Sequence, residues 1–138
     1  MSNLIDIEAG PFHMVGKLES ELAPETCARF VKMLPLVSKF IHVRWSGEGC
    51  WIPFGEQDFG LPWENATRYP AIGQMIFYPG GFSEAEILLA YGSVAFASKL
   101  GPLAGNHFLT IVEGQEYLPE LGKRTLWDGG QQVTLKQR

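Results

Sequence analysis

The sequence predicts a mainly β protein, a closed or nearly closed barrel of about eight short strands with one main helix. Sixteen glycines and nine prolines divide the 138 residues into short apolar runs. Runs repeated at intervals of roughly 8–12 residues are typical of β-sandwiches and β-barrels. Hydrophobic residues make up 46% of the chain and charged residues 19%. This composition allows residues 1–138 to bury a core as a single domain.

The first two strands are expected at residues 4–8 and 14–22, where apolar and polar side chains alternate. The turn Ala9-Gly10-Pro11 would join them as a hairpin. Later strands are predicted from short apolar runs bounded by Gly or Pro. They fall on both sides of a Gly-Glu-Gly break at 47–49, and at 73–79, 86–91, 106–113 and 131–135. Between them lie two irregular connections, 54–67 and 92–105, and a short helical turn at 117–121.

The main helix is expected over residues 24–34. The apolar residues of this stretch recur at i, i+3, i+4 and i+7 and share one face: Cys27, Phe30, Val31 and Leu34. Pro24 suits the first turn, because its missing N–H would have no partner inside the helix. Ala23 is a poor N-cap, so tertiary contacts are expected to hold the start of this helix.

Residues 41–53, IHVRWSGEGCWIP, carry polar side chains among apolar and aromatic ones. Strand alternation places Arg44 on the face opposite Trp45. The two glycines that flank Glu48 permit a bulge or bend, so Glu48 need not follow the alternation and is expected at the same opening as Arg44. An ion pair between Arg44 and Glu48 is the alternative. His42 is expected to be plain surface.

The bulk charge and the cysteine content exclude several classes of protein. The formal net charge is −4, which disfavours a nucleic-acid partner because such a partner requires a basic face. The start, MSNLIDIEAG, lacks the features of a signal peptide, and no stretch approaches the roughly 20 apolar residues of a membrane span. A cytoplasmic location is therefore expected. Cys27 and Cys50 are too few for a disulfide framework and are expected to be free core thiols.

No metal or other cofactor is expected. His13, His42 and His107 have no Cys or carboxylate partner at the spacing of metal ligands. Glu84-x-Glu86 places two carboxylates on one strand face, but such pairs are as often solvated as metal-bound. Neither a nucleophile elbow nor a phosphate-binding loop is present.

Residues 15–34, VGKLESELAPETCARFVKML, resemble the cyclophilin segment in which a strand leads through Ala-Pro-x-Thr into the first helix. The prolyl-isomerase signature of cyclophilins, F-H-R followed by F-x-x-Q-G-G-D, is absent. Four later stretches are instead similar to the bacterial cyclophilin-like families of unknown function, with Gln74 in place of the usual Asp. They are Arg44-Trp-Ser-Gly-Glu48, Leu61-Pro-Trp-Glu-Asn65, Gly73-Gln-Met-Ile-Phe-Tyr-Pro-Gly80 and Tyr91 to Ser98.

The resemblance covers roughly residues 4–115. It implies an eight-stranded cyclophilin-like barrel. It implies no reaction, because those families are uncharacterised and one fold serves many functions.

A barrel brings residues from several strands and loops together at one mouth. The catalytic candidates are Arg44, which could hold a carboxylate or amide oxygen, and His107, which could transfer protons near neutral pH. Glu48 is the third, because a carboxyl half-buried among tryptophans would have a raised pKa. The ligand-binding candidates are Trp45, Glu64, Asn65, Tyr91, Ser98 and Asn106.

Several candidates also have a purely structural interpretation. Asn65 is a common turn former, Ser98 lies among small residues that pack in loops, and His107 at the start of a strand can be a structural histidine.

These observations favour a small-molecule pocket at the barrel mouth of a cofactor-free hydrolase or isomerase, acting on a small polar or cyclic amide or acid compound. A non-catalytic ligand-binding module or subunit would use the same pocket without proton transfer. A peptidyl-prolyl isomerase is a weaker hypothesis, because the signature is missing. Four tryptophans and nine phenylalanines are also compatible with a homo-oligomer.

Overall fold

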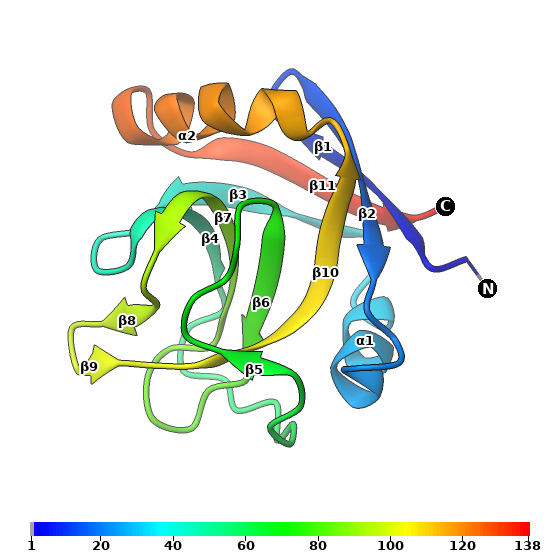
Figure 1. Cartoon of the computed structure of the whole chain (residues 1–138), viewed down its shortest axis with the longest axis vertical. Coiled ribbons are helices and arrows are strands. Elements are labelled where there is room, and N and C mark those ends of the chain that lie inside the picture. Colours follow the sequence, from blue (N-terminus) through cyan, green and yellow to red (C-terminus); the bar gives the residue numbers. More distant parts are fainter. Residues whose placement is uncertain (1) are drawn as a thin grey trace.

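A closed antiparallel barrel of eight strands forms the body of the computed structural model, which describes residues 2–138 (Figure 1). In the order in which they pair around the barrel, the strands are β2 (Phe12–Leu18), β1 (Leu4–Ala9), β11 (Gln131–Gln137), β3 (Leu36–His42), β4 (Gly47–Pro53), β7 (Glu86–Val94), β6 (Gln74–Tyr78) and β10 (Gly105–Glu113). Pairing of β10 with β2 closes the ring. The predicted mainly β barrel with one main helix is confirmed.

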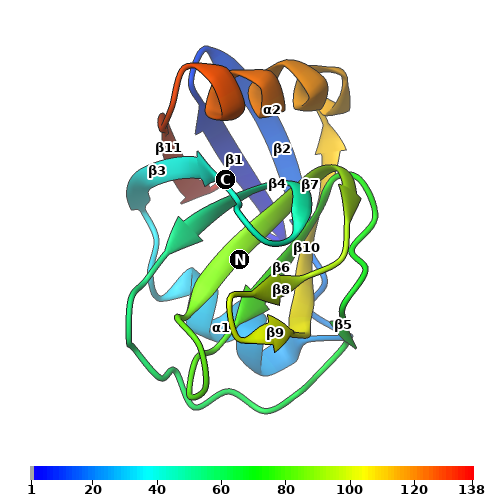
Figure 2. The same ribbon diagram turned by 90° about the vertical axis from the view of Figure 1, so that its left-hand side faces the viewer.

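Three short strands and three helical segments complete the fold. β5 (Ala66–Thr67) pairs with β10, whereas β8 (Ala97–Ser98) and β9 (Gly101–Pro102) form a separate hairpin. The helical segments are α1 (Pro24–Val31), the 3-10 turn η1 (Gln115–Tyr117) and α2 (Leu118–Trp127). Figures 1 and 2 both show α1 and α2 at opposite ends of the barrel. No helix within residues 2–138 is long and apolar enough to cross a membrane.

The predicted N-terminal hairpin is confirmed, but its second strand is shorter than the expected 14–22. β1 and β2 pair antiparallel along the whole of β1. β2 ends at Leu18 because Glu19 turns the chain: its carbonyl accepts hydrogen bonds from the N–H groups of Leu22 and Ala23. This turn leads into α1, which begins at Pro24 as predicted and ends at Val31, before the expected residue 34.

The second helix was underestimated from the sequence, which predicted only a short turn at 117–121. The buried face of α2 has the spacing i, i+3, i+4 and i+7: Leu118, Leu121, Gly122 and Thr125. Gly122 and Thr125 are not large apolar residues, so the sequence does not show a continuous apolar stripe here. Gly122 is small because the ring of Tyr91 occupies the place where its Cβ would lie.

Two hydrophobic clusters lie on opposite faces of the sheet. The larger one receives buried side chains from all eight barrel strands and from both α-helices, so it fills the interior and closes the ends. The smaller one lies on the outer face of β6 and β7, under the segment that contains β8 and β9. It consists of Ile76, Tyr78, Leu88, Ala90, Val94, Phe96 and Leu103.

The two cysteines are free and buried in the larger cluster, as predicted. Burial raises the pKa of the Cys27 thiol and of the Cys50 thiol to about 11. Both groups are therefore neutral core residues at physiological pH.

Gly16 lets β2 and β10 approach closely where the barrel closes. A Cβ at this position would lie 2.5 Å from Leu109 Cδ2 in the interior. We expect Gly16→Ala to lower the free energy of unfolding by about 1–3 kcal/mol, the usual cost of overpacking a core, as measured by urea denaturation. Gly130→Ala is the control, because its Cβ would meet no atom closer than 3.4 Å. An equal loss in both variants would contradict this account of barrel closure.

Candidate functional site

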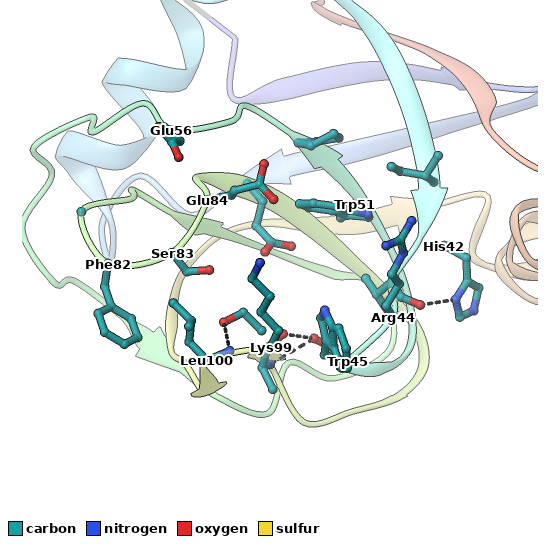
Figure 3. Close-up of a pocket in the computed structure, with 18 of the residues that line it drawn as sticks. His42, Arg44, Trp45, Trp51, Glu56, Phe82, Ser83, Glu84, Lys99 and Leu100 are labelled. Atoms are coloured by element: carbon teal, nitrogen blue, oxygen red, sulfur yellow. Dashed lines mark hydrogen bonds between the residues drawn. The ribbon is translucent and has the colours of Figure 1, made fainter.

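A cleft of about 1170 Å³ lies on the outer face of the barrel, over β4 and β7 (Figure 3). Trp51 and Glu86 form part of its floor. Trp51 packs against the outer cluster, and strand alternation places Glu86 on the same face as Leu88 of that cluster. The walls are the β3–β4 turn (43–46), the loop 54–58, the β6–β7 turn (81–84) and the β8–β9 hairpin (97–100).

The predicted position of the pocket at the barrel mouth is therefore wrong. Side chains fill the interior of the barrel. Helices α1 and α2 lie over its two ends (Figures 1 and 2). A cavity of this size forms instead where the cover over the outer face of the sheet is incomplete.

Three of the predicted site residues line the cleft: Arg44, Trp45 and Ser98. Two walls are fastened to one another by Ser46, which is buried. Its Oγ donates a hydrogen bond to the Ala97 carbonyl and accepts one from the Ala97 N–H, each at 3.0 Å. These bonds hold the β3–β4 turn against the β8–β9 hairpin. The part played by the three lining residues toward a ligand stays a prediction.

Charged side chains divide between two sides of the cleft. Arg44 and Lys99 come from the β3–β4 turn and the β8–β9 hairpin, and both reach into the cavity in Figure 3. Glu56 and Glu84 come from the loop 54–58 and the β6–β7 turn, on the other side. None of the four forms an ion pair with another side chain of residues 2–138. The cleft therefore offers unpaired charges of both signs.

Glu48 does not line the cleft. The predicted bulge is present, since the β4–β7 register shifts between the glycines that flank it. The bulge directs the exposed Glu48 carboxylate to Ser93, whose N–H donates a hydrogen bond to it at 2.9 Å. The alternative pairing with Arg44 is not formed either, because both ion pairs found within residues 2–138 involve Asp6.

Glu86, the first residue of β7, is a lining residue that the sequence analysis did not select. It is only 7% exposed, and its carboxyl makes no hydrogen bond or ion pair with the other described residues. Its oxygens are not among the fully buried polar atoms that lack a partner, so they open to the cleft. Burial and, secondly, the nearby Glu84 carboxylate raise its pKa to about 8. Glu86 therefore carries a proton at neutral pH. The available signal was a carboxylate at the head of an otherwise apolar run, Glu86–Ala90, that is buried throughout.

His42 is not plain surface, contrary to the expectation. It is half-buried and lines the cleft. Its Nδ1 lies 2.7 Å from the Val43 carbonyl, and its Nε2 lies 2.7 Å from the Tyr91 hydroxyl. A carbonyl can only accept, so Nδ1 donates and Nε2 accepts the Tyr91 proton. Burial raises the pKa of Tyr91, and this side chain packs beneath α2 rather than in the cleft.

Glu64 and Asn106 lie together away from the cleft, at the start of α1. The Glu64 carboxylate accepts hydrogen bonds from the N–H of Thr26 at 2.6 Å and of Glu25 at 3.4 Å. It thereby supplies the tertiary contact expected in place of an N-cap at Ala23. Buried Asn106 accepts the Glu64 N–H and donates to Thr26 Oγ1 and to a loop carbonyl. Both residues are thus occupied in joining α1, the loop and β10.

His107 and Asn65 belong to the same region and are also engaged in hydrogen bonds. Thr110 donates its hydroxyl proton to Glu19 at 2.7 Å, so His107 Nε2 donates to Thr110 at 2.8 Å. Asn65 Nδ2 donates to the His107 carbonyl at 2.8 Å and lies 3.3 Å from Nδ1. Burial lowers the pKa of His107. The predicted meeting of His107 with Arg44 and Glu48 at one opening is wrong.

The sequence matches the family model described as "Protein of unknown function (DUF3830)" over residues 5–137. The chain belongs to the DUF3830 family. A search of curated proteins gave no match to it.

The DUF3830 barrel is similar to a solved structure described as "Structure of McbB in complex with tryptophan". The TM-score is 0.73 with 16% sequence identity. The superposition covers 97% of this chain but 44% of the McbB chain, so the DUF3830 protein spans less than half the length of that neighbour. The likeness shows a shared barrel fold.

Within residues 2–138 the DUF3830 protein has no group of three or more His, Cys, Asp or Glu side chains placed to hold a metal ion. Its donor groups are dispersed between the cleft, the Glu64–Asn106 region and the surface.

Glu86→Gln is expected to change the pH dependence of stability. The folded pKa of about 8 lies above the ordinary 4.5, so the protonated wild type has its full stability below pH 4.5 and loses stability as pH rises through 8. Gln carries no titrating proton, so the variant should be more stable than wild type at pH 8, by a free energy on the order of a few kcal/mol. Chemical denaturation from pH 4 to 9 measures the difference, and parallel curves would contradict a buried protonated Glu86.

Glu64→Ala is expected to lower the free energy of unfolding by about 1 kcal/mol, because α1 loses its substitute cap. Urea denaturation measures the loss. Glu21→Gln, at an exposed carboxylate in the turn before α1, is the control and should leave stability unchanged. If Glu64→Ala left the free energy of unfolding unchanged, the carboxylate would not cap the helix.

Proposed function

We propose that the outer cleft binds a small organic molecule and that Glu86 donates a proton to it, as in a hydrolase or isomerase of a small polar or cyclic amide or acid compound. The observation that carries this proposal is Glu86 itself. A carboxyl that is 7% exposed, unpartnered and turned to an open cleft is costly to folding, and such groups cluster at functional sites.

The chemistry of Glu86 follows from its protonation state. A carboxylic acid with a pKa of about 8 holds its proton at neutral pH and can give it to an amide nitrogen or a carbonyl oxygen as a bond breaks or rearranges. The resulting carboxylate can take a proton back from water or product. Arg44 would hold the oxygen on which negative charge develops, through the fork of its guanidinium group. This step needs no cofactor.

A non-catalytic ligand-binding module is the second candidate, and the rim of the cleft favours it. Trp45, Phe82 and Leu100 line the cavity although each is strongly exposed. Exposed apolar groups around a cleft are typical of ligand-binding surfaces. This candidate differs from the first only in that Glu86 would form a hydrogen bond to the ligand without transferring its proton.

One comparison supports binding of a small molecule. McbB, which shares the barrel fold, is described in complex with tryptophan.

We also propose a cyclophilin-like assignment for the barrel, because it has the strand number implied by the resemblance to those families. The cytoplasmic location and self-association remain proposals from the sequence.

A thermal-shift screen of small acids, amines, amides and amino acids against the wild type tests binding. Compounds that bind in the cleft should lose their shift in Trp45→Ala. Trp63→Ala is the matched control, because Trp63 is 61% exposed, close to the 58% of Trp45, but lies outside the cleft. Absence of any compound with this behaviour would overturn the proposal.

Product analysis by mass spectrometry then separates the two candidates. For an enzyme, Glu86→Gln should lower turnover by about 10²–10⁴-fold, the usual contribution of a general acid, while the Kd changes little. Recovery of every bound compound unchanged would instead identify a binding module.

A further inference from the structure

The charges of the cleft are arranged so that no protein group neutralises them. Arg44 and Lys99 lie on one side and Glu56 and Glu84 on the other, and none forms an ion pair within residues 2–138. Asp58, the third acidic wall residue, accepts the Gly60 N–H at 2.9 Å, a bond to a neutral group that leaves its charge in place. Two cations and three carboxylates of the walls thus face an occupant of the cavity, and Glu56 and Glu84 make no hydrogen bond within residues 2–138.

A group of acidic side chains is often only a solvated surface. Its environment decides whether such a group can be taken as part of a binding site. Here Glu86 lies in the same cavity and is only 7% exposed, and its carboxyl has no partner among the described residues. The Glu86 oxygens open to the cavity, so the occupant of the cleft supplies their hydrogen-bond partner. A ligand that displaces water from this carboxyl would meet the charges around it as well.

The apolar floor lies between the two charged sides. Figure 3 shows Trp51 between Glu84 and Arg44. Trp51 is half-buried, which fixes its ring against the outer cluster and leaves one part open to the cavity. A flat apolar group on this ring would place its substituents toward both charged sides.

We propose that the ligand of the cleft is a zwitterion, whose anionic group is held by Arg44 and Lys99 and whose ammonium group is held by Glu56 and Glu84. The inference rests on the proposed function and names the ligand class of that site. Charge-assisted hydrogen bonds at both ends would select such a compound over one with a single charge.

A matched set of benzene compounds tests the charge requirement: 4-(aminomethyl)benzoate, whose two charged groups stand at opposite ends of the ring, with 4-methylbenzylamine, 4-methylbenzoate and 4-methylbenzamide. Isothermal titration with the wild type should give the lowest Kd for 4-(aminomethyl)benzoate, by about tenfold relative to each singly charged analogue. The strongest compounds of the thermal-shift screen are compared with their singly charged analogues in the same way. Equal or tighter binding of amine, acid or amide overturns the zwitterion proposal.

Charge-removing variants assign the two ends. Arg44→Ala combined with Lys99→Ala should weaken binding of 4-(aminomethyl)benzoate about tenfold and leave that of 4-methylbenzylamine within about twofold, since only the carboxylate loses its partners. Glu56→Gln combined with Glu84→Gln should weaken binding of 4-(aminomethyl)benzoate equally and leave that of 4-methylbenzoate unchanged. Lys136→Ala and Glu21→Gln, at exposed positions outside the cleft, are the controls. Identical effects on all compounds overturn the assignment.

The outcomes separate this inference from the proposed function. If screened compounds lose their shift in Trp45→Ala but are neutral or singly charged and insensitive to both double variants, the cleft binds ligands and the zwitterion proposal alone is overturned. If no compound of any class depends on Trp45, the proposed function is overturned directly, and the zwitterion proposal with it.

Discussion

Pairing of β2 with β10 is the interaction on which the rest of the structure depends. Once it closes the ring, every barrel strand has two partners and the inner faces form one filled core. The close approach at Gly16 and Leu109 shows how little space remains inside. A molecule as large as an amino acid cannot enter such an interior, so any binding site must be built on the outside. Closure of the barrel thus leaves the outer surface as the place for a cleft.

The outer site exists because the sheet is covered only in part. The segment that contains β8 and β9 folds back over the apolar outer face of β6 and β7. Its hairpin is held against the β3–β4 turn by the two hydrogen bonds of Ser46 with Ala97. Beyond the edge of this cover, the outer face of β7 continues to Glu86, which is shielded by the walls but not paired. The same covering segment therefore stabilises the fold and shapes the cleft.

Periodicity predicted the architecture well, because it records which faces are apolar. The hairpin of β1 and β2, the start of α1 and the bulge at Glu48 followed from alternation, helical spacing and glycine positions. α2 was underestimated because Gly122 and Thr125 stand on its buried face where larger apolar residues would mark it. In β6 and β7, apolar residues occupy both faces, so alternation could not tell the interior from the outside. The pocket was assigned to the barrel mouth because strands and loops of a barrel converge there, and alternation gave no sign of a cleft on the outer face.

The site residues divide by whether the protein satisfies their hydrogen bonds. Glu64, Asn65, Asn106 and His107 looked like ligand contacts in the sequence, yet each has its partners in the neighbouring helix, loop or strand. Sequence alone could not show this, because the partners lie far away along the chain.

Glu86 differs from these residues, because its side chain is almost completely buried and its carboxyl has no partner among the described residues. The free energy lost by burying a carboxyl in this way is not recovered within the fold. A ligand that accepts its proton or its hydrogen bond would recover it, which is why we base the proposed site on Glu86 rather than on His107 and its hydrogen-bonded neighbours.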